Sequence, residues 1–151
     1  MTPNPDNSQA PATKSVRVLV AEDSPLNRQI ALMQLERLGY EADGVADGLA
    51  VLEAVKRTSY GIILMDCQMP EMDGFEATAE IRRLEGDERH TTICALTAHA
   101  MAGDRERCLG AGMDDYISKP LTIGVLQNKI AYWIYAKPNR AEGRPSLVRV
   151  V

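Results

Sequence analysis

Five residues whose side chains could take part in one reaction each follow a stretch of the chain that is typical of a strand. These residues are Glu22, Asp23, Asp66, Thr97 and Lys119. Three carboxylates in a small space repel one another, and a hard divalent cation with oxygen ligands, such as Mg²⁺, relieves that repulsion. A lysine acts as a point charge for an anion, and a threonine hydroxyl donates to a phosphoryl oxygen. This combination of residue types fits phosphoryl transfer to an aspartate.

The elements expected to position these residues alternate between strand and helix. Short, mostly apolar runs at 16–21, 60–65 and 92–96 are typical of strands buried on both faces. Weaker strands are expected at 41–45 and 115–117. Five such strand-helix units imply an α/β fold with an open parallel sheet and helices on both faces. In such sheets functional residues lie in loops at the carboxyl ends of the strands, so the five residues should meet at one edge.

The helices between these strands are indicated by caps and by apolar spacing. Ser24 and Pro25 predict the start of a helix that runs to Leu38, and Asp73 with Glu76 predicts a capping box. A short polar helix is expected at 102–110. Two inward stripes follow from helical periodicity. They are Ala77, Ile81 and Leu84 in one helix, and Ile123, Leu126, Ile130, Trp133 and Ile134 in the last.

Length and composition limit the classes of protein to which the chain can belong. Its 151 residues favour one domain, which we expect at 16–136, with tails or linkers at 1–15 and 137–151. The net charge of −4 argues against electrostatic binding of nucleic acid. No apolar run approaches the ~18 residues of a membrane span. The 3 cysteines, without a CxxC pair, favour free thiols in a reducing, cytoplasmic setting.

Four ordered motifs give the chain a family resemblance. VLVAEDSPLNR, ILMDCQMPEMDGFEA, ALTAHA and GAGMDDYISKP resemble the receiver domain of two-component response regulators, in order and in spacing. The resemblance covers about 16–133, and the wording is most similar to receivers of hybrid sensor histidine kinases. It implies a flavodoxin-like, doubly wound (βα)5 fold with strand order 2-1-3-4-5.

The resemblance also implies a role for each site residue. Asp66 is the implied phosphoacceptor, and Thr97 and Lys119 are implied to contact the phosphoryl group, with a cis bond between Lys119 and Pro120. The remaining implied roles are metal binding (Mg²⁺ or Mn²⁺) by Glu22, Asp23, Asp66 and the backbone carbonyl of Gln68, an aromatic switch at Tyr116, and tuning of phosphorylation lifetime by Gln68 and His99.

The implied partners are proteins of a phosphorelay. A histidine kinase or histidine phosphotransfer protein would donate the phosphoryl group, docking near the first helix. A downstream protein or a second copy of the chain would bind the face formed by the fourth helix, fifth strand and fifth helix. The chain itself is then an acceptor that loses its phosphoryl group by autodephosphorylation, rather than a turnover enzyme, although its parent could be a hybrid histidine kinase.

Other functions on a similar fold fit the residues less well. A haloacid-dehalogenase-type phosphatase needs a second acid two positions after its aspartate, where this chain has Gln68. A flavodoxin-like binder of flavin mononucleotide needs a hydroxyl- and glycine-rich first loop, where this chain has EDSPLN. The remaining alternative is a pseudo-receiver, an interaction module that is not phosphorylated. Because the chain keeps both Asp66 and Lys119, we favour the phosphoacceptor.

Overall fold

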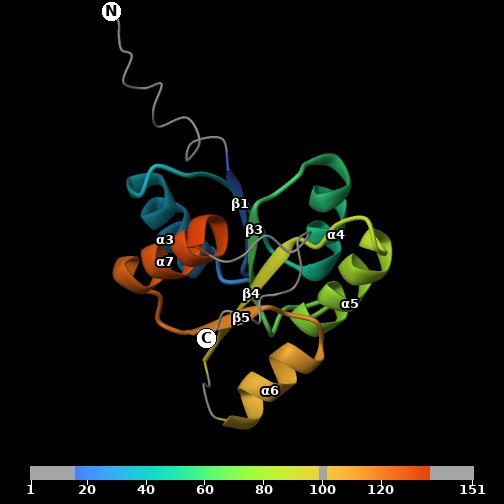
Figure 1. Ribbon diagram of the computed structural model, residues 1–151. Coiled ribbons are helices and arrows are strands. Elements are labelled where there is room, and N and C mark those ends of the chain that lie inside the picture. Colours follow the sequence, from blue (N-terminus) through green and yellow to red (C-terminus); the bar gives the residue numbers. More distant parts are fainter. Residues whose placement is uncertain (1–15, 99–101, 137–151) are drawn as a thin grey trace, which may run out of the picture.

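The computed structural model describes residues 16–98 and 102–136, which form a parallel sheet between two layers of helices (Figure 1). The order across the sheet is β2-β1-β3-β4-β5, and every neighbouring pair is parallel. This confirms the predicted flavodoxin-like α/β fold and its strand order. The strands are β1 (Arg17–Ala21), β2 (Glu41–Val45), β3 (Ile62–Asp66), β4 (Thr92–Thr97) and β5 (Asp115–Ser118).

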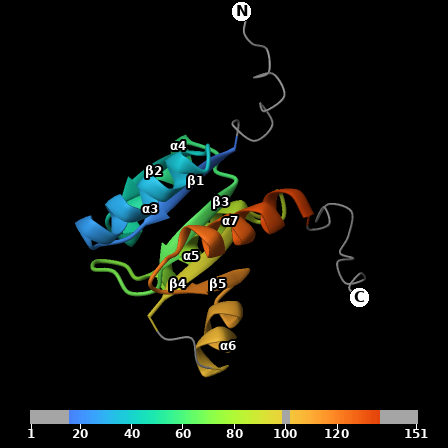
Figure 2. The same cartoon turned by 90° about the vertical axis from the view of Figure 1, so that its left-hand side faces the viewer.

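The helices are divided between the two faces of the sheet. α3 (Pro25–Arg37) and α7 (Ile123–Ala131) cover the face that is turned toward the viewer in Figure 2. α4 (Gly48–Arg57), α5 (Gly74–Glu85) and α6 (Ala102–Gly110) lie on the other side, and α7 continues into a π-helical turn, η1 (Tyr132–Ala136). Within the two described stretches, no helix is long and apolar enough to cross a membrane.

Each strand of the sheet contributes side chains to two separate apolar clusters. Ile63 and Met65 of β3 pack toward α4 and α5, whereas Ile62 and Leu64 pack toward α3 and α7. The alternation follows from the two-residue period of a strand. All residues of β3 and β4 are buried, as the unbroken apolar runs predict. The buried centre of the sheet therefore ends at Asp66 and Thr97.

The predicted helix starts are present as hydrogen-bonded caps. The Ser24 hydroxyl accepts from the Asn27 N–H at 3.2 Å. The Asp73 carboxylate accepts from the Glu76 N–H at 2.9 Å, and the Glu76 carboxylate accepts from the Asp73 N–H at 3.0 Å, which completes the capping box. These caps fix where α3 and α5 begin, directly beside the carboxyl edge of the sheet.

The prediction of inward-facing side chains is wrong for two residues, Leu84 and Ile123. Leu84 is 48% exposed, because the buried stripe of α5 continues instead through Ile81 to Glu85. Glu85 is turned inward by polar contacts: it binds Arg82 at 2.9 Å and accepts the Thr91 N–H at 2.8 Å. Ile123 is 37% exposed, since it lies in the first turn of α7, before the helix settles onto the sheet.

Tyr40, just before β2, makes the fold sensitive to alkaline pH. Burial raises the pKa of its phenol to about 12, and the neighbouring Tyr135 phenol contributes. The unfolded chain loses this proton near its ordinary value of 10, so stability is lost as pH rises from about 10 toward 12. We expect the stability of wild type relative to Tyr40→Phe to fall by about 1–3 kcal/mol across that window. Denaturant titrations at stepwise pH test this, and parallel curves for the two proteins would contradict it.

Candidate functional site

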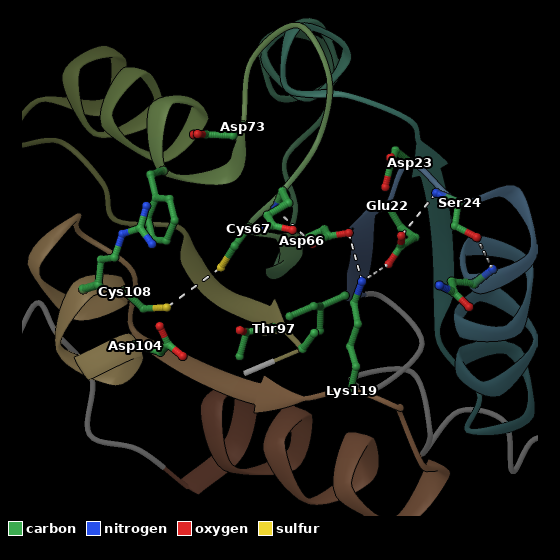
Figure 3. Close-up of a pocket in the computed structure, with 16 residues that line it drawn as sticks. Glu22, Asp23, Ser24, Asp66, Cys67, Asp73, Thr97, Asp104, Cys108 and Lys119 are labelled. Carbon is green, nitrogen blue, oxygen red and sulfur yellow. Dashed lines mark hydrogen bonds and ion pairs between the residues drawn. The ribbon is translucent and has the colours of Figure 1, made fainter. Parts of the chain in front are cut away.

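Three carboxylates meet where β1 and β3 end (Figure 3). Glu22 and Asp23 follow β1 directly, and Asp66 is the last residue of β3. One carboxylate oxygen from each lies within 4.8 Å of the others. Glu22 and Asp66 are 3% and 6% exposed, whereas Asp23 is exposed to solvent. The parallel sheet thus brings the three acids together although they are far apart in the chain.

Lys119 joins two of these acids from the far side of the site. Its Nζ lies 2.9 Å from Glu22 Oε1 and 2.9 Å from Asp66 Oδ2. Lys119 follows β5, and its N–H donates to the Thr97 carbonyl at 2.8 Å, which holds its backbone at the end of β4. The Lys119–Pro120 peptide bond is cis, as the resemblance implies.

The protonation of these groups reflects burial and crowding. Burial raises the pKa of Glu22 above its ordinary value and the Asp66 carboxylate raises it further, against the opposing bonds from Lys119 and the Ser24 N–H. Burial lowers the pKa of Lys119, but its bonds to the two carboxylates outweigh burial, so the net shift is upward. The Lys119 ammonium therefore contacts two of the three crowded carboxylates, and the site keeps an excess of negative charge. Such an all-oxygen, excess-negative set fits a hard divalent cation.

Thr97 and Gln68 lie beside Asp66, and both line the same cavity. Thr97 is buried at the end of β4, opposite Ser118 in the sheet. The Gln68 N–H donates to Asp66 Oδ1 at 3.1 Å, which leaves Oδ2 as the oxygen held by Lys119. The two oxygens of Asp66 thus have different environments, and its side chain is held in one orientation.

Of the two remaining predicted residues, Tyr116 stands apart from this cluster, since it does not line the cavity. Tyr116 is half-buried in β5, with Lys129 Nζ 5.8 Å from the centre of its ring. Lys129 of α7 and Trp133 of η1 both bind Asp115, at 2.8 Å each, and so tie both helical segments to β5. His99 lies outside the described residues, as do the tails at 1–15 and 137–151.

The site occupies a cavity of about 430 Å³, whose far wall sequence reasoning did not identify. Arg107 of α6 places its guanidinium 4.4 Å from the ring centre of Phe75 in α5. Next to it, Cys67 Sγ lies 3.9 Å from Cys108 Sγ. Phe75, Arg107 and Cys108 sit on helices with no strand-end position to mark them, and Cys67, although it follows β3, carries no sequence signal for its partner. Only the packing of α6 against α5 therefore reveals this wall.

Gly74 allows α5 to begin against the loop that carries Asp66. A Cβ at this position would overlap the Asp66 carbonyl oxygen, and the Gly74 N–H donates to the Cys67 carbonyl at 3.0 Å. We expect Gly74→Ala to lower the free energy of unfolding by about 2 kcal/mol through this overlap. Gly124→Ala, where nothing lies within 4 Å, is the matched control and should not destabilise the fold. Equal denaturation midpoints for the two variants would contradict the expected overlap.

Comparison with known proteins identifies the family. Residues 18–131 match the response regulator receiver domain, so the chain belongs to this family. Receiver domains take part in two-component phosphorelay signalling, which makes the pseudo-receiver alternative the less favoured one.

Two curated relatives are a hybrid signal transduction protein and a sensor histidine kinase. The hybrid signal transduction protein dokA of Dictyostelium discoideum is 40% identical over 81% of this chain and 7% of its own length. The sensor histidine kinase GacS of Pseudomonas protegens is 38% identical over 90% of this chain and 16% of its own length. The chain therefore spans only a small part of these relatives.

Two solved structures are also similar. The receiver domain of sensor histidine kinase PA1611 from Pseudomonas aeruginosa is 44% identical, with a TM-score of 0.72 over 79% of this chain and 97% of that one. That structure has a magnesium ion coordinated in its active-site cleft. The Saccharomyces cerevisiae receiver of Ssk1, solved with the histidine phosphotransfer protein Ypd1, is 30% identical, with a TM-score of 0.72 over 78% of this chain and 88% of that one.

Proposed function

We propose that Asp66 accepts a phosphoryl group from a phosphohistidine of a partner protein. The observation that carries the proposal is the placement of Asp66: a buried carboxylate at the end of β3, within 4.8 Å of two further acids and bound by Lys119 at 2.9 Å. Its location in a cavity, rather than in the closed core, gives an incoming phosphoryl group access.

The three acids fit a divalent cation. Glu22, Asp23, Asp66 and the backbone carbonyl of Gln68 would hold Mg²⁺ or Mn²⁺, and the magnesium-bound PA1611 receiver supports this assignment. When bound, the cation spreads the charge that develops on the phosphoryl oxygens. Because Asp23 is exposed while Glu22 is buried, Asp23 is the acid that a cation can reach with the least change in the protein.

The transfer itself requires one new bond and one broken bond. An Asp66 carboxylate oxygen attacks phosphorus, the bond from phosphorus to the histidine nitrogen breaks, and its electron pair remains on the imidazole. The Gln68 N–H and Lys119 hold the two carboxylate oxygens in place beforehand. Lys119, which now binds two carboxylates, afterwards has phosphoryl oxygens as stronger acceptors.

The phosphorylated site would change the surface through Thr97. Its hydroxyl gains a phosphoryl oxygen as a partner only in the phosphorylated state, and such a differential contact is what shifts a two-state equilibrium. Thr97 ends β4, directly beside β5, which carries Tyr116. A change in the segment after Thr97 and in Tyr116 would then reach the face formed by α6, β5 and α7, where a downstream protein or a second copy would bind.

The phosphodonor would dock beside α3. Leu26, Ile30 and Met33 of that helix are 69%, 40% and 50% exposed, an apolar stretch next to the cavity. The Ssk1 receiver in complex with Ypd1 supports a histidine phosphotransfer protein, or a histidine kinase, as the partner.

Further proposals concern the lifetime of the phosphorylated state and the cellular setting of the domain. The domain acts as a stoichiometric acceptor, either as a stand-alone receiver or as part of a hybrid histidine kinase, and water attack tuned by Gln68 and His99 returns it to the starting state. Its three free cysteines support a cytoplasmic setting.

Phosphorylation by a small donor tests the proposed function. The purified chain is incubated with Mg²⁺ and acetyl phosphate and its intact mass is recorded. We expect the gain of one phosphoryl group that survives acid, is lost in base and requires Mg²⁺. No gain under these conditions would favour the pseudo-receiver.

Thr97→Ala separates phosphorylation from the switch. The variant lacks the hydroxyl but keeps Asp66, the acids and Lys119, so we expect phosphoryl uptake within about threefold of wild type. Amide hydrogen exchange in α6 and β5 should then respond to phosphorylation in wild type and much less in the variant. An unchanged response in Thr97→Ala would show that another group transmits the signal. Thr92→Ala, a buried threonine at the opposite end of β4, is the matched control.

A further inference from the structure

Cys67 and Cys108 form a pair of thiols on the wall of the cavity, on the side away from Glu22, Asp23 and Lys119 (Figure 3). Their sulfur atoms lie 3.9 Å apart, although the two residues are separated by 41 positions in the chain. Cys67 immediately follows Asp66, and Cys108 belongs to α6. Both are free thiols.

Cys108 provides the buried contact of α6 with the rest of the domain, and the exposed Arg107 adds a contact with Phe75. Among the side chains described in this helix, from Gly103 to Gly110, it is the only buried one, at 1% exposure. Cys67, in contrast, has a fixed backbone: its N–H donates to the Leu96 carbonyl at 3.2 Å and its carbonyl accepts from Gly74. The thiol pair therefore joins a fixed point beside Asp66 to a helix whose other described side chains are exposed or half-buried.

The geometry permits a bond between the two sulfurs. A disulfide requires about 2 Å between sulfur atoms, so the pair must approach by roughly another 2 Å. Rotation of both side chains, together with a small shift of α6, can supply this, because no other described side chain of α6 is buried and the exposed Arg107 can follow the Phe75 ring.

The third cysteine has a different environment. Cys94 is completely buried in β4, in the apolar cluster beneath α3 and α7, on the opposite face of the sheet. It does not line the cavity, whereas Cys67 and Cys108 both do. A small polar oxidant that enters the cavity therefore reaches Cys67 first, which is 7% exposed, with the buried Cys108 directly beside it, and Cys94 serves as an internal control.

We propose that Cys67 and Cys108 are a two-electron oxidation site, at which a peroxide generates an intramolecular disulfide that fixes α6 against the end of β3. One sulfur attacks a peroxide oxygen, the O–O bond breaks, and a sulfenic acid and one water form. The second sulfur displaces the sulfenic hydroxyl, which leaves with that thiol's proton as a second water, and the S–S bond forms. Two thiols are oxidised and one peroxide is reduced to two waters.

The bond would have a consequence for signalling, which rests on the proposed function. α6 forms part of the face that is expected to change on phosphorylation. A covalent tie from α6 to the residue after Asp66 would keep that face in one arrangement. The oxidised domain would thus hold a phosphoryl group without passing on the full surface change.

Mass spectrometry of the peroxide-treated chain tests the site. The reduced protein is treated with hydrogen peroxide in its native state, unfolded, alkylated and digested. We expect a monomer that has lost two hydrogens, a cross-linked peptide pair joining 67 to 108, and alkylation of Cys94 alone. Dithiothreitol should restore alkylation of all three. Three free thiols after treatment, unbridged sulfinic acid at Cys67, or a bridge between two chains would each overturn the proposal.

Variants and hydrogen exchange test what the bond does. Cys94→Ala should form the bridge to the same extent as wild type, whereas Cys108→Ala should form none. Amide exchange in α6 should slow by about tenfold in the oxidised chain, and unchanged exchange would overturn the fixing of α6. None of these readouts uses a phosphodonor. Failure of the reduced chain to take up phosphoryl groups would therefore count only against Asp66 as the acceptor. The thiol site is tested separately, by the presence or absence of the cross-link between 67 and 108.

Discussion

Asp66→Asn is expected to abolish phosphoryl uptake from acetyl phosphate, a loss of at least about 1,000-fold. The carboxamide has nearly the size of the carboxylate, but it has no anionic oxygen to attack phosphorus. Its carbonyl can still accept a bond from Lys119 or from the Gln68 N–H, which now lie 2.9 and 3.1 Å from the Asp66 oxygens. The fold should therefore survive, and intact mass together with thermal unfolding separates loss of chemistry from loss of structure.

Asp104→Asn is the matched control for this prediction. Asp104 lines the same cavity from α6, and it lies outside the group of acids that could share a metal ion. It should take up a phosphoryl group nearly as fast as wild type. A folded Asp66→Asn variant that still gains a base-labile phosphoryl group would contradict the assignment of Asp66.

Asp23→Asn is expected to weaken Mg²⁺ binding by about 100-fold, since even partners outside the ligand set typically change metal affinity by about 10–100-fold. The substitution suits the test because Asp23 is exposed, so replacing it disturbs no packing. Glu22, in contrast, is buried and bound to Lys119, so a change there would alter both the metal site and the fold. Isothermal titration with Mg²⁺ measures the effect directly.

The control for Asp23 is an exposed acid at the other edge of the sheet. Asp87 lies in the loop between α5 and β4, and Asp87→Asn removes the same charge far from the cavity. It should leave Mg²⁺ affinity within about twofold of wild type, because exposed charges beyond a Debye length are largely screened. Equal weakening in both variants would mean that net charge, rather than a ligand, determines binding.

The sequence predicted the fold and the meeting of the acids because both depend on regular features. Buried strands at 60–65 and 92–96 are recognisable from unbroken apolar runs, and parallel pairing then brings Asp66 and Thr97 to one edge. The cap residues Ser24 and Asp73 marked helix starts because their chemistry is local. Contacts that depend on strand ends and caps are thus accessible without coordinates.

Contacts that depend on how helices pack were not accessible in this way. The 3.9 Å approach of Cys67 to Cys108 results from the placement of α6, a polar helix without an apolar stripe to orient it. Periodicity alone places Leu84 inward, because it cannot foresee that Arg82 and Thr91 turn Glu85 toward the core. The two ion pairs that Lys119 forms with Glu22 and Asp66 likewise required coordinates, since a strand-end position gives no side-chain direction.

Borohydride reduction of the phosphorylated chain tests the central claim most directly. An acyl phosphate on an aspartate is reduced to homoserine, so peptide sequencing by mass spectrometry shows which carboxyl group carried the phosphoryl group. We predict homoserine at position 66 only, dependent on Mg²⁺ and on prior phosphorylation. Conversion at 22, 23 or 104 instead, or a stable phosphoryl group on a histidine, would contradict the account.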